Sequence, residues 1–103
     1  MEVLLFGGTG EGRELAQWLL TQHIPALVCV ATEYGETLLP AGIEAHVGRL
    51  DEAGMAALMA SRPFTHVVDA THPYAVEVTP NIQAAAAAVG LPCLRLVRHS
   101  DGE

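Results

Sequence analysis

Five apolar runs, each of strand length, alternate along the chain with segments of helical periodicity. Runs that are apolar along their whole length are typical of parallel strands whose sheet is covered by helices on both faces. Parallel neighbours also need a crossover connection, which is almost always right-handed. We therefore predict an α/β fold with a doubly wound parallel sheet of about five strands in the order 3-2-1-4-5. The predicted strands are Glu2–Phe6, Ala26–Thr32, Glu44–Val47, His66–Thr71 and Cys93–Val97.

Three helices are indicated by apolar residues at helical spacing and by residues that favour helix ends. The first helix directly follows a glycine-rich loop, and the second is capped by Asp51. For the third, Thr79 is predicted as the N-cap with Pro80 in the first turn, and Gly90 ends the helix. The alternative is a helix that begins near Tyr74 and is kinked at Pro80.

The charge of the chain limits its partners. Twelve acidic and five basic residues give a formal net charge of −7, and every basic side chain other than histidine is an arginine. This balance disfavours a non-specific hold on nucleic acid or on an anionic membrane surface. The apolar stretches are well short of the ~20 residues of a membrane span, and no signal-peptide pattern opens the chain. We expect a cytoplasmic protein that binds neither nucleic acid nor membrane.

The two cysteines suggest no metal centre. Cys29 and Cys93 lie far apart, with no other cysteine or histidine at ligand spacing. They therefore indicate neither a zinc site nor a disulfide framework, and we expect both to be small buried residues inside strands.

A glycine-rich loop follows the first predicted strand at once, with the sequence GGTGEGR at positions 7–13. Its spacing, GxGxG, approximates the GxGxxG loop of dinucleotide-binding folds. Glycine there permits a tight turn, lets backbone N–H groups approach a pyrophosphate, and lets the helix pack closely on the strand, a role that falls to Gly12. A glycine turn without a ligand is the alternative. The predicted cofactor-binding residues of this loop are Gly8, Thr9, Gly10, Glu11, Gly12 and Arg13, with the Thr9 hydroxyl and Arg13 as possible donors to phosphate.

A second loop, after the second predicted strand, holds Thr32, Glu33, Tyr34 and Gly35. Nucleotide-binding folds distinguish NAD from NADP at this position, and an acid there accepts the ribose hydroxyls. Glu33 therefore favours NADH by the simple rule. The other three residues can still receive a 2′-phosphate if Glu33 points to solvent, and an exposed loop carboxylate without a ligand is equally open. The predicted cofactor is NADPH or NADH.

A third loop, Thr71-His72-Pro73-Tyr74, lies at the end of the fourth predicted strand. In the predicted strand order it lies at the carboxyl edge of the sheet, beside the crevice that opens where the order reverses between the first and fourth strands. An imidazole can donate a proton near neutral pH, and a tyrosine ring can stack or form a hydrogen bond. We predict His72 and Tyr74 as catalytic residues and Thr71 as a cofactor contact. A structural role for His72 is the competing interpretation.

Other charged residues are assigned ordinary roles. Asp69, inside the fourth predicted strand, is expected to accept hydrogen bonds from backbone or loop donors. Arg49, Arg95 and Arg98 are interpreted as surface arginines.

Taken in order, the segments GGTGEGR, TEYGE, HVGRLD, VVDATHPYAVEVTPNI and LRLVR resemble the amino-terminal half of the precorrin-6A reductase family of cobalamin biosynthesis. The most specific segment is DATHPYA followed by Asn81, whereas Pro80 departs from the family pattern. The resemblance implies an oxidoreductase that uses NADPH, or NADH in the cobalt-precorrin branch. Its substrate would be a precorrin-type tetrapyrrole rich in carboxylates, in which one ring double bond is reduced.

The resemblance also implies a domain organisation. Residues 1–98 would form a Rossmann-like dinucleotide-binding domain, and residues 99–103 a tail or the start of a linker to a second α/β domain that is absent from this chain. The active site would lie between the two domains, so the chain alone is expected to be inactive. A non-catalytic domain that senses nicotinamide dinucleotides is the competing hypothesis, and it would not need the THPYA segment. A short-chain dehydrogenase is disfavoured because its Tyr-x-x-x-Lys pair needs a lysine.

Overall fold

The computed structural model describes residues 1–74 and 76–97. Five parallel strands form one sheet in the order β3-β2-β1-β4-β5, which confirms the predicted order. The strands are β1 (Val3–Phe6), β2 (Ala26–Val30), β3 (Glu44–Val47), β4 (His66–Asp69) and β5 (Cys93–Arg95). The helices are α1 (Gly10–Thr21), α2 (Glu33–Thr37), α3 (Glu52–Ala60) and α4 (Val78–Val89). The predicted tail, residues 99–103, lies outside the described residues.

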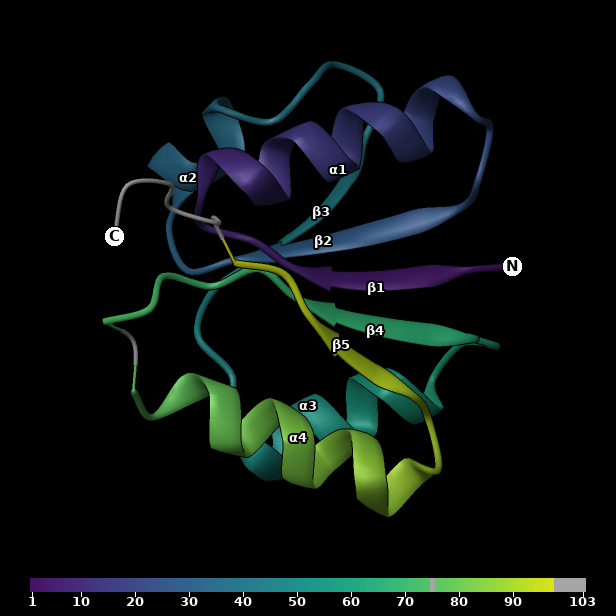
Figure 1. Cartoon of the computed structure of the whole chain (residues 1–103), viewed down its shortest axis with the longest axis vertical. Helices are drawn as coiled ribbons and strands as arrows, with labels where there is room; N and C mark the ends of the chain where they lie inside the picture. Colours follow the sequence, from purple (N-terminus) through teal and green to yellow (C-terminus); the bar gives the residue numbers. More distant parts are fainter. Residues whose placement is uncertain (75, 98–103) are drawn as a thin grey trace, which may run out of the picture.

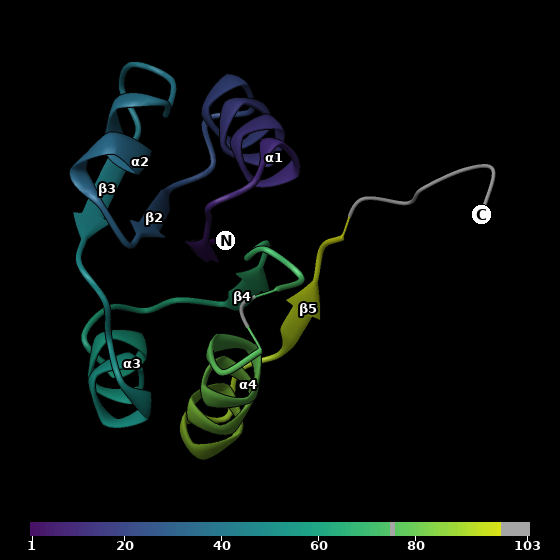
Figure 2. The same cartoon turned by 90° about the vertical axis from the view of Figure 1, so that its left-hand side faces the viewer.

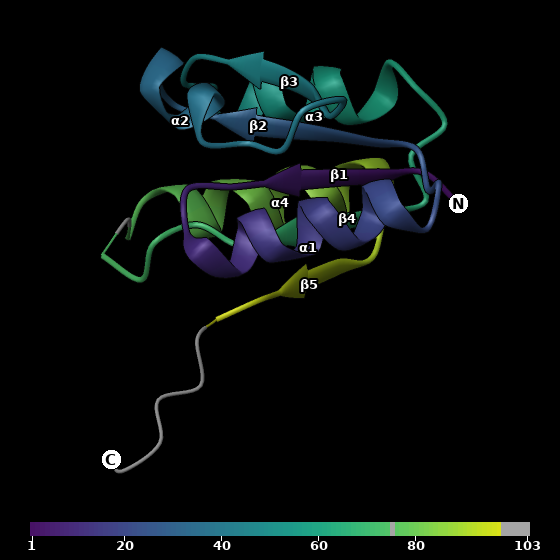
Figure 3. The ribbon, with the colours of Figure 1, turned by 90° about the horizontal axis from the view of Figure 1, so that it is seen from above.

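The sheet is the middle of three layers. Helices α1 and α2 cover one face, and α3 and α4 cover the other (Figures 1 and 2). Seen from above, α1 lies along β1, whereas α2 lies near the end of β2 (Figure 3). This arrangement is the doubly wound, Rossmann-like fold, in which the loops after β1, β2 and β4 meet the same edge of the sheet.

Two hydrophobic clusters lie on the two faces, because successive side chains of a strand point to opposite sides. In β1, Leu4 and Phe6 belong to the cluster under α3 and α4, and Val3 and Leu5 belong to the cluster under α1. On the α3 and α4 side the helices contribute Met55, Met59, Ile82, Ala85 and Ala86. Both faces of the central strand are therefore buried, as its uninterrupted apolar sequence predicts.

The start of α4 differs from the prediction. Its N-cap residue is Glu77, which makes no side-chain capping hydrogen bond, and the helix begins at Val78 rather than near Tyr74. The Thr79 hydroxyl instead donates to Asp69 Oδ2 at 2.5 Å, so the predicted Thr79 N-cap is wrong. Pro80 lies in the first turn, as predicted, where its missing N–H costs no intrahelical hydrogen bond.

Helix α2 lies where the sequence predicts a loop. Thr32 is its N-cap, and the Thr32 hydroxyl oxygen accepts a hydrogen bond from the Gly35 N–H at 3.0 Å. A helix of five residues has no apolar period to detect, and a local cap is enough to form one turn. Several predicted strands are also one or two residues too long, because their last residues turn into the loops of the carboxyl edge.

Both cysteines lie in strands, with Cys29 buried in β2 and Cys93 half-buried in β5. Burial raises the pKa of the Cys29 thiol to about 12, and it also raises the pKa of Cys93. Because the thiolate is the reactive form, the native protein should react slowly with a thiol reagent at pH 8. In a Cys93→Ser variant, Cys29 should react only after the protein is unfolded. Rapid modification of that variant under native conditions would contradict the burial of Cys29.

No helix in the described part of the chain is both long and apolar enough to span a membrane.

Candidate functional site

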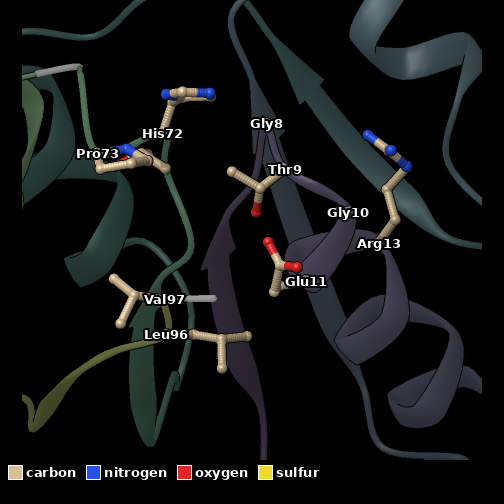
Figure 4. Close-up of a pocket in the computed structure, with 10 residues that line it drawn as sticks. Gly8, Thr9, Gly10, Glu11, Arg13, His72, Pro73, Leu96 and Val97 are labelled. Carbon is tan, nitrogen blue, oxygen red and sulfur yellow. The ribbon is translucent and has the colours of Figure 1, made fainter. Parts of the chain in front are cut away.

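A cavity of about 430 Å³ opens at the carboxyl edge of the sheet, between the loops that follow β1 and β4 (Figure 4). The chain leaves β1 toward β2 on one side and reaches β4 on the other, so the strand order reverses here. Doubly wound folds bind their ligands in the crevice at this kind of point. The cavity is lined by Gly8, Thr9, Gly10, Glu11, Arg13, Thr71, His72, Pro73, Leu96 and Val97.

The glycine loop needs its glycines for different reasons. Gly8 has a φ of +136°, a backbone conformation that residues with a side chain rarely adopt. At Gly12 an added Cβ atom would lie 3.1 Å from the Ala70 Cβ atom, so this glycine lets α1 pack closely on the sheet. At Gly10 the nearest atom to an added Cβ is a terminal nitrogen of Arg13, at 3.7 Å. The protein itself therefore leaves room for a side chain at Gly10.

Thr9 ties the glycine loop to the neighbouring strand. Its hydroxyl donates to the Ala70 carbonyl oxygen at 2.7 Å and accepts from the Gly12 N–H at 3.2 Å, which makes Thr9 the N-cap of α1. A hydroxyl can donate one hydrogen bond, and Thr9 donates it to the Ala70 carbonyl oxygen. Thr9 therefore positions the loop, and its hydroxyl is not an available donor to phosphate in this arrangement.

The amino-terminal end of α1 is suited to an anion. The N–H groups of Gly12 and Arg13 bond to Thr9 atoms, whereas the described residues offer no acceptor to the Gly10 N–H. Unpaired N–H groups and the helix dipole favour a negative charge at this end. The mainly backbone cradle and the special conformation of Gly8 fit a pyrophosphate better than they fit a metal ion. Within residues 1–74 and 76–97, no three metal-ligating side chains gather.

The loop after β4 is held by a buried carboxylate. Asp69 is 1% exposed. Its Oδ1 atom accepts hydrogen bonds from the Thr71 N–H at 2.9 Å and from the Thr71 hydroxyl at 2.6 Å, and its Oδ2 atom accepts from the Thr79 hydroxyl. Asp69 thereby joins the end of β4 to the first turn of α4, and the expectation that it serves loop donors is confirmed.

Arg95 completes this network, and its interpretation as a surface arginine is wrong. Its Nη1 atom donates to Asp69 Oδ1 and to the Asp69 carbonyl, both at 3.1 Å, and to the Thr71 carbonyl at 2.9 Å. Asp69 and Arg95 are register partners on neighbouring parallel strands. That register, combined with the need of a buried carboxylate for a cation, is the signal that could have identified the pair. Arg49 is exposed, as expected, and Arg98 lies outside the described residues.

His72 and Tyr74 lie close together on the loop that this network holds. Their rings stack with centroids 4.4 Å apart and planes tilted by 31°. The Tyr74 N–H donates to His72 Nδ1 at 3.4 Å. His72 lines the cavity, whereas Tyr74 is 84% exposed and does not line it. The two predicted catalytic residues therefore form one exposed aromatic pair at the cavity mouth.

The four residues predicted after β2 do not line this cavity. Thr32, Glu33 and Tyr34 are exposed at the start of α2, and Gly35 packs against Val30. The structure thus brings together the loops after β1 and β4 and leaves the predicted loop after β2 on the other side of β1. Two cavity residues, Leu96 and Val97, were missed because they follow the short edge strand β5 and have no motif of their own.

A family model described as precorrin-6x reductase CbiJ/CobK matches residues 2–103. The precorrin-6A reductase of Rhodococcus erythropolis is 36% identical over 98 residues, which cover 93% of this chain and 39% of that protein. The cobalt-precorrin-6A reductase of Synechocystis sp. is 33% identical over 98 residues, 93% of this chain and 38% of that protein.

A solved structure of CobK precorrin-6A reductase has the same fold, with a TM-score of 0.84 and 29% sequence identity. It matches 96% of this chain, which covers 39% of that structure. The chain therefore spans about two fifths of the length of the relatives that it matches.

Proposed function

This chain belongs to the precorrin-6x reductase family, and from this premise we propose that it holds a reduced nicotinamide dinucleotide for the reduction of precorrin-6A or its cobalt form. One observation carries the proposal: the glycine loop and the His72 loop face one cavity at the switch point of the sheet. The glycine loop alone would fit many nucleotide ligands. The second loop adds groups that suit a reaction beside the dinucleotide.

The glycine loop would hold the pyrophosphate. The Gly10 N–H and the end of α1 supply hydrogen-bond donation and partial positive charge, and Gly8 lets the backbone approach closely. The Glu11 carboxylate faces the same space (Figure 4), and as an acceptor it suits a ribose hydroxyl or a carboxamide N–H rather than a phosphate.

The other wall of the cavity would hold the nicotinamide end. Pro73, Leu96 and Val97 give it an apolar lining, which limits the access of water to a reactive ring. When bound, the reduced nicotinamide supplies a hydride to one carbon of the substrate. His72 is the proposed donor of the proton to the neighbouring carbon, with water as the alternative. Tyr74 stacks on His72 and would contact the macrocycle.

Binding of the macrocycle requires more cationic side chains than this chain contains. A substrate with many carboxylates needs cationic contacts, whereas this chain has a formal net charge of −7. We propose that a second α/β domain supplies the opposite wall of the active site, with residues 1–98 as the dinucleotide-binding part. The reaction would take place in the cytoplasm.

The choice between NADPH and NADH is expected to depend on Glu33. Its exposed carboxylate repels a 2′-phosphate through a screened interaction of ~1 kcal/mol. A Glu33→Gln variant should therefore bind NADPH up to about fivefold more tightly, with little change for NADH. Binding titrations of both dinucleotides measure this ratio. Glu52→Gln, which removes an exposed charge on α3, is the matched control, and an unchanged ratio in Glu33→Gln would show that residue 33 does not meet the ribose.

Turnover tests the proposed function. This chain is fused in place of the matching segment of the Rhodococcus erythropolis reductase, and nicotinamide oxidation is followed with precorrin-6A. We expect oxidation by the chimera and none by the chain alone. His72→Ala should slow the chimera by at least about tenfold, since water is a poorer donor than a positioned imidazole.

Two outcomes would contradict parts of this account. Full turnover by the chain alone would refute the need for a second wall. Wild-type rates in both His72→Ala and Tyr74→Phe chimeras would remove these two side chains from the mechanism and leave the loop a packing role. A binding domain that never supports turnover, although the chimera is folded, would favour the dinucleotide-sensing alternative.

A further inference from the structure

We propose that Arg13 recognises the 2′-phosphate of NADPH, so that the residue favouring NADPH over NADH lies on the first turn of α1. In dinucleotide-binding folds the arginine that binds this phosphate commonly follows the second strand. The inference deepens the proposed function and rests on it, because it assumes that a nicotinamide dinucleotide occupies the cavity.

The segment after β2 contains no cationic side chain that could bind the 2′-phosphate. Residues 31–37 include two glutamates and no basic residue. The Gly35 N–H is bonded to the Thr32 hydroxyl oxygen, and the Thr37 hydroxyl donates to the Tyr34 carbonyl oxygen at 2.6 Å. A 2′-phosphate at the end of β2 would therefore meet two carboxylates and no cation within residues 31–37. Its counter-charge has to come from another element.

Among the arginines that the structure describes, two are candidates for this counter-charge. Arg62 is paired with Glu2 and Glu44, at the amino-terminal ends of β1 and β3 and far from the cavity loops. Arg95 is paired with Asp69. Among the described residues, Arg13 and Arg49 are the arginines for which no ion pair is found.

Arg13 has the position that the 2′-phosphate requires. It lines the cavity from the first turn of α1, and Figure 4 shows its guanidinium on the opposite side of the cavity from His72. The sheet order places β2 and β4 on opposite sides of β1. A dinucleotide with its nicotinamide at His72 and its pyrophosphate at the glycine loop would therefore extend its adenosine end toward Arg13.

The chemistry of the side chain supports the same assignment. A guanidinium stays protonated and can donate two parallel hydrogen bonds to a phosphate, which an uncharged hydroxyl cannot replace. Without such a cation, the net negative charge of the chain and the Glu33 carboxylate would repel the 2′-phosphate and weaken NADPH binding. The positive charge of Arg13 would offset this repulsion at the 2′-phosphate itself.

Arg49 is the competing cation. The neighbouring Gly48 N–H donates to the Val30 carbonyl oxygen at 2.9 Å, so Arg49 follows a residue bonded to the end of β2. It is exposed, however, and it does not line the cavity. It belongs in the experiment as the alternative determinant.

The test is a comparison of binding constants for NADPH and NADH in the wild-type chain and in Arg13→Gln, Arg13→Lys and Arg49→Gln. Arg13→Gln should weaken NADPH binding by roughly 10- to 100-fold, the scale of hydrogen bonds to a charged group, and NADH binding by less than about twofold. Arg13→Lys should keep part of the preference. Competition by 2′,5′-ADP should show the same loss as NADPH, whereas competition by 5′-AMP should change little. Circular dichroism checks that each variant is folded.

The outcomes separate the inference from the proposed function. An equal loss for NADPH and NADH in Arg13→Gln would assign Arg13 to the pyrophosphate and overturn the inference while leaving the proposed function intact. An unchanged ratio in Arg13→Gln, or a loss of preference in Arg49→Gln alone, would also overturn it. Failure of the wild-type chain to bind either dinucleotide would overturn the proposed function and the inference together.

Discussion

Replacement of Asp69 by alanine is expected to lower the free energy of unfolding by about 3–5 kcal/mol, the cost of leaving the partner of a buried ion pair without its counter-charge. The variant would leave the Arg95 guanidinium, 27% exposed, beside an apolar gap. The hydroxyls of Thr71 and Thr79 would lose their acceptor. Urea denaturation followed by circular dichroism measures the change, which is large against the ~5–15 kcal/mol of a typical domain.

Two further variants make the Asp69 experiment specific. Asp69→Asn keeps the shape and part of the hydrogen bonding, so it should destabilise less than Asp69→Ala. Asp51→Ala removes an exposed carboxylate that caps α3 through the Gly54 N–H, and it should cost only ~1 kcal/mol. Similar losses in Asp51→Ala and Asp69→Ala would show that the buried network contributes no more than an ordinary cap.

Gly10→Val is expected to weaken dinucleotide binding by about 100-fold or more while leaving the fold nearly as stable as the wild type. Outside the backbone of its own helix, the nearest protein atom to an added Cβ is the flexible end of the Arg13 side chain, so this Cβ meets no backbone of another element. A bound pyrophosphate, in contrast, needs the backbone of this loop to approach closely. The free energy of unfolding and the dinucleotide affinity are measured for the wild type and for Gly10→Val. Unfolding free energies within ~1 kcal/mol of each other would show that the loss of binding does not come from a loss of stability.

Gly12→Ala is the matched control for the glycine loop. An added Cβ there lies 3.1 Å from the Ala70 Cβ atom, so α1 and Ala70 must separate by a few tenths of an ångström. This variant should lose stability by ~1–3 kcal/mol, as over-packed sites commonly do. If Gly10→Val lost as much stability as Gly12→Ala, its loss of binding would not report on a ligand contact.

The sheet order and the glycine loop could be predicted from the sequence because both follow from local patterns. Apolar runs of strand length with helical crossovers leave few topologies, and Gly12 is needed by the close approach of α1 to the sheet. The cavity between the loops after β1 and β4 then follows from the strand order. Each of these steps uses only neighbours in sequence and a general rule of topology.

Two of the errors concern partners that are distant in sequence, and the third concerns a short local helix. Thr79 has the residue type of an N-cap, but its hydroxyl donates a hydrogen bond to Asp69, ten positions earlier. Arg95 resembles a surface residue until the β4–β5 register places it beside a buried carboxylate. Helix α2 depends on one capping hydrogen bond, which no periodicity reveals. For Thr79 and Arg95 a contact with Asp69 decides the role of the side chain, whereas α2 is set by a cap between residues three positions apart.

The most direct test of the central claim, that the loop after β1 binds a reduced nicotinamide dinucleotide, is a fluorescence titration of NADPH and NADH against this chain and its Gly10→Val variant. The account predicts saturable binding of at least one dinucleotide by the wild-type chain and its loss in Gly10→Val, with both proteins folded. No saturable binding of either dinucleotide, or equal binding by the two proteins, would contradict it.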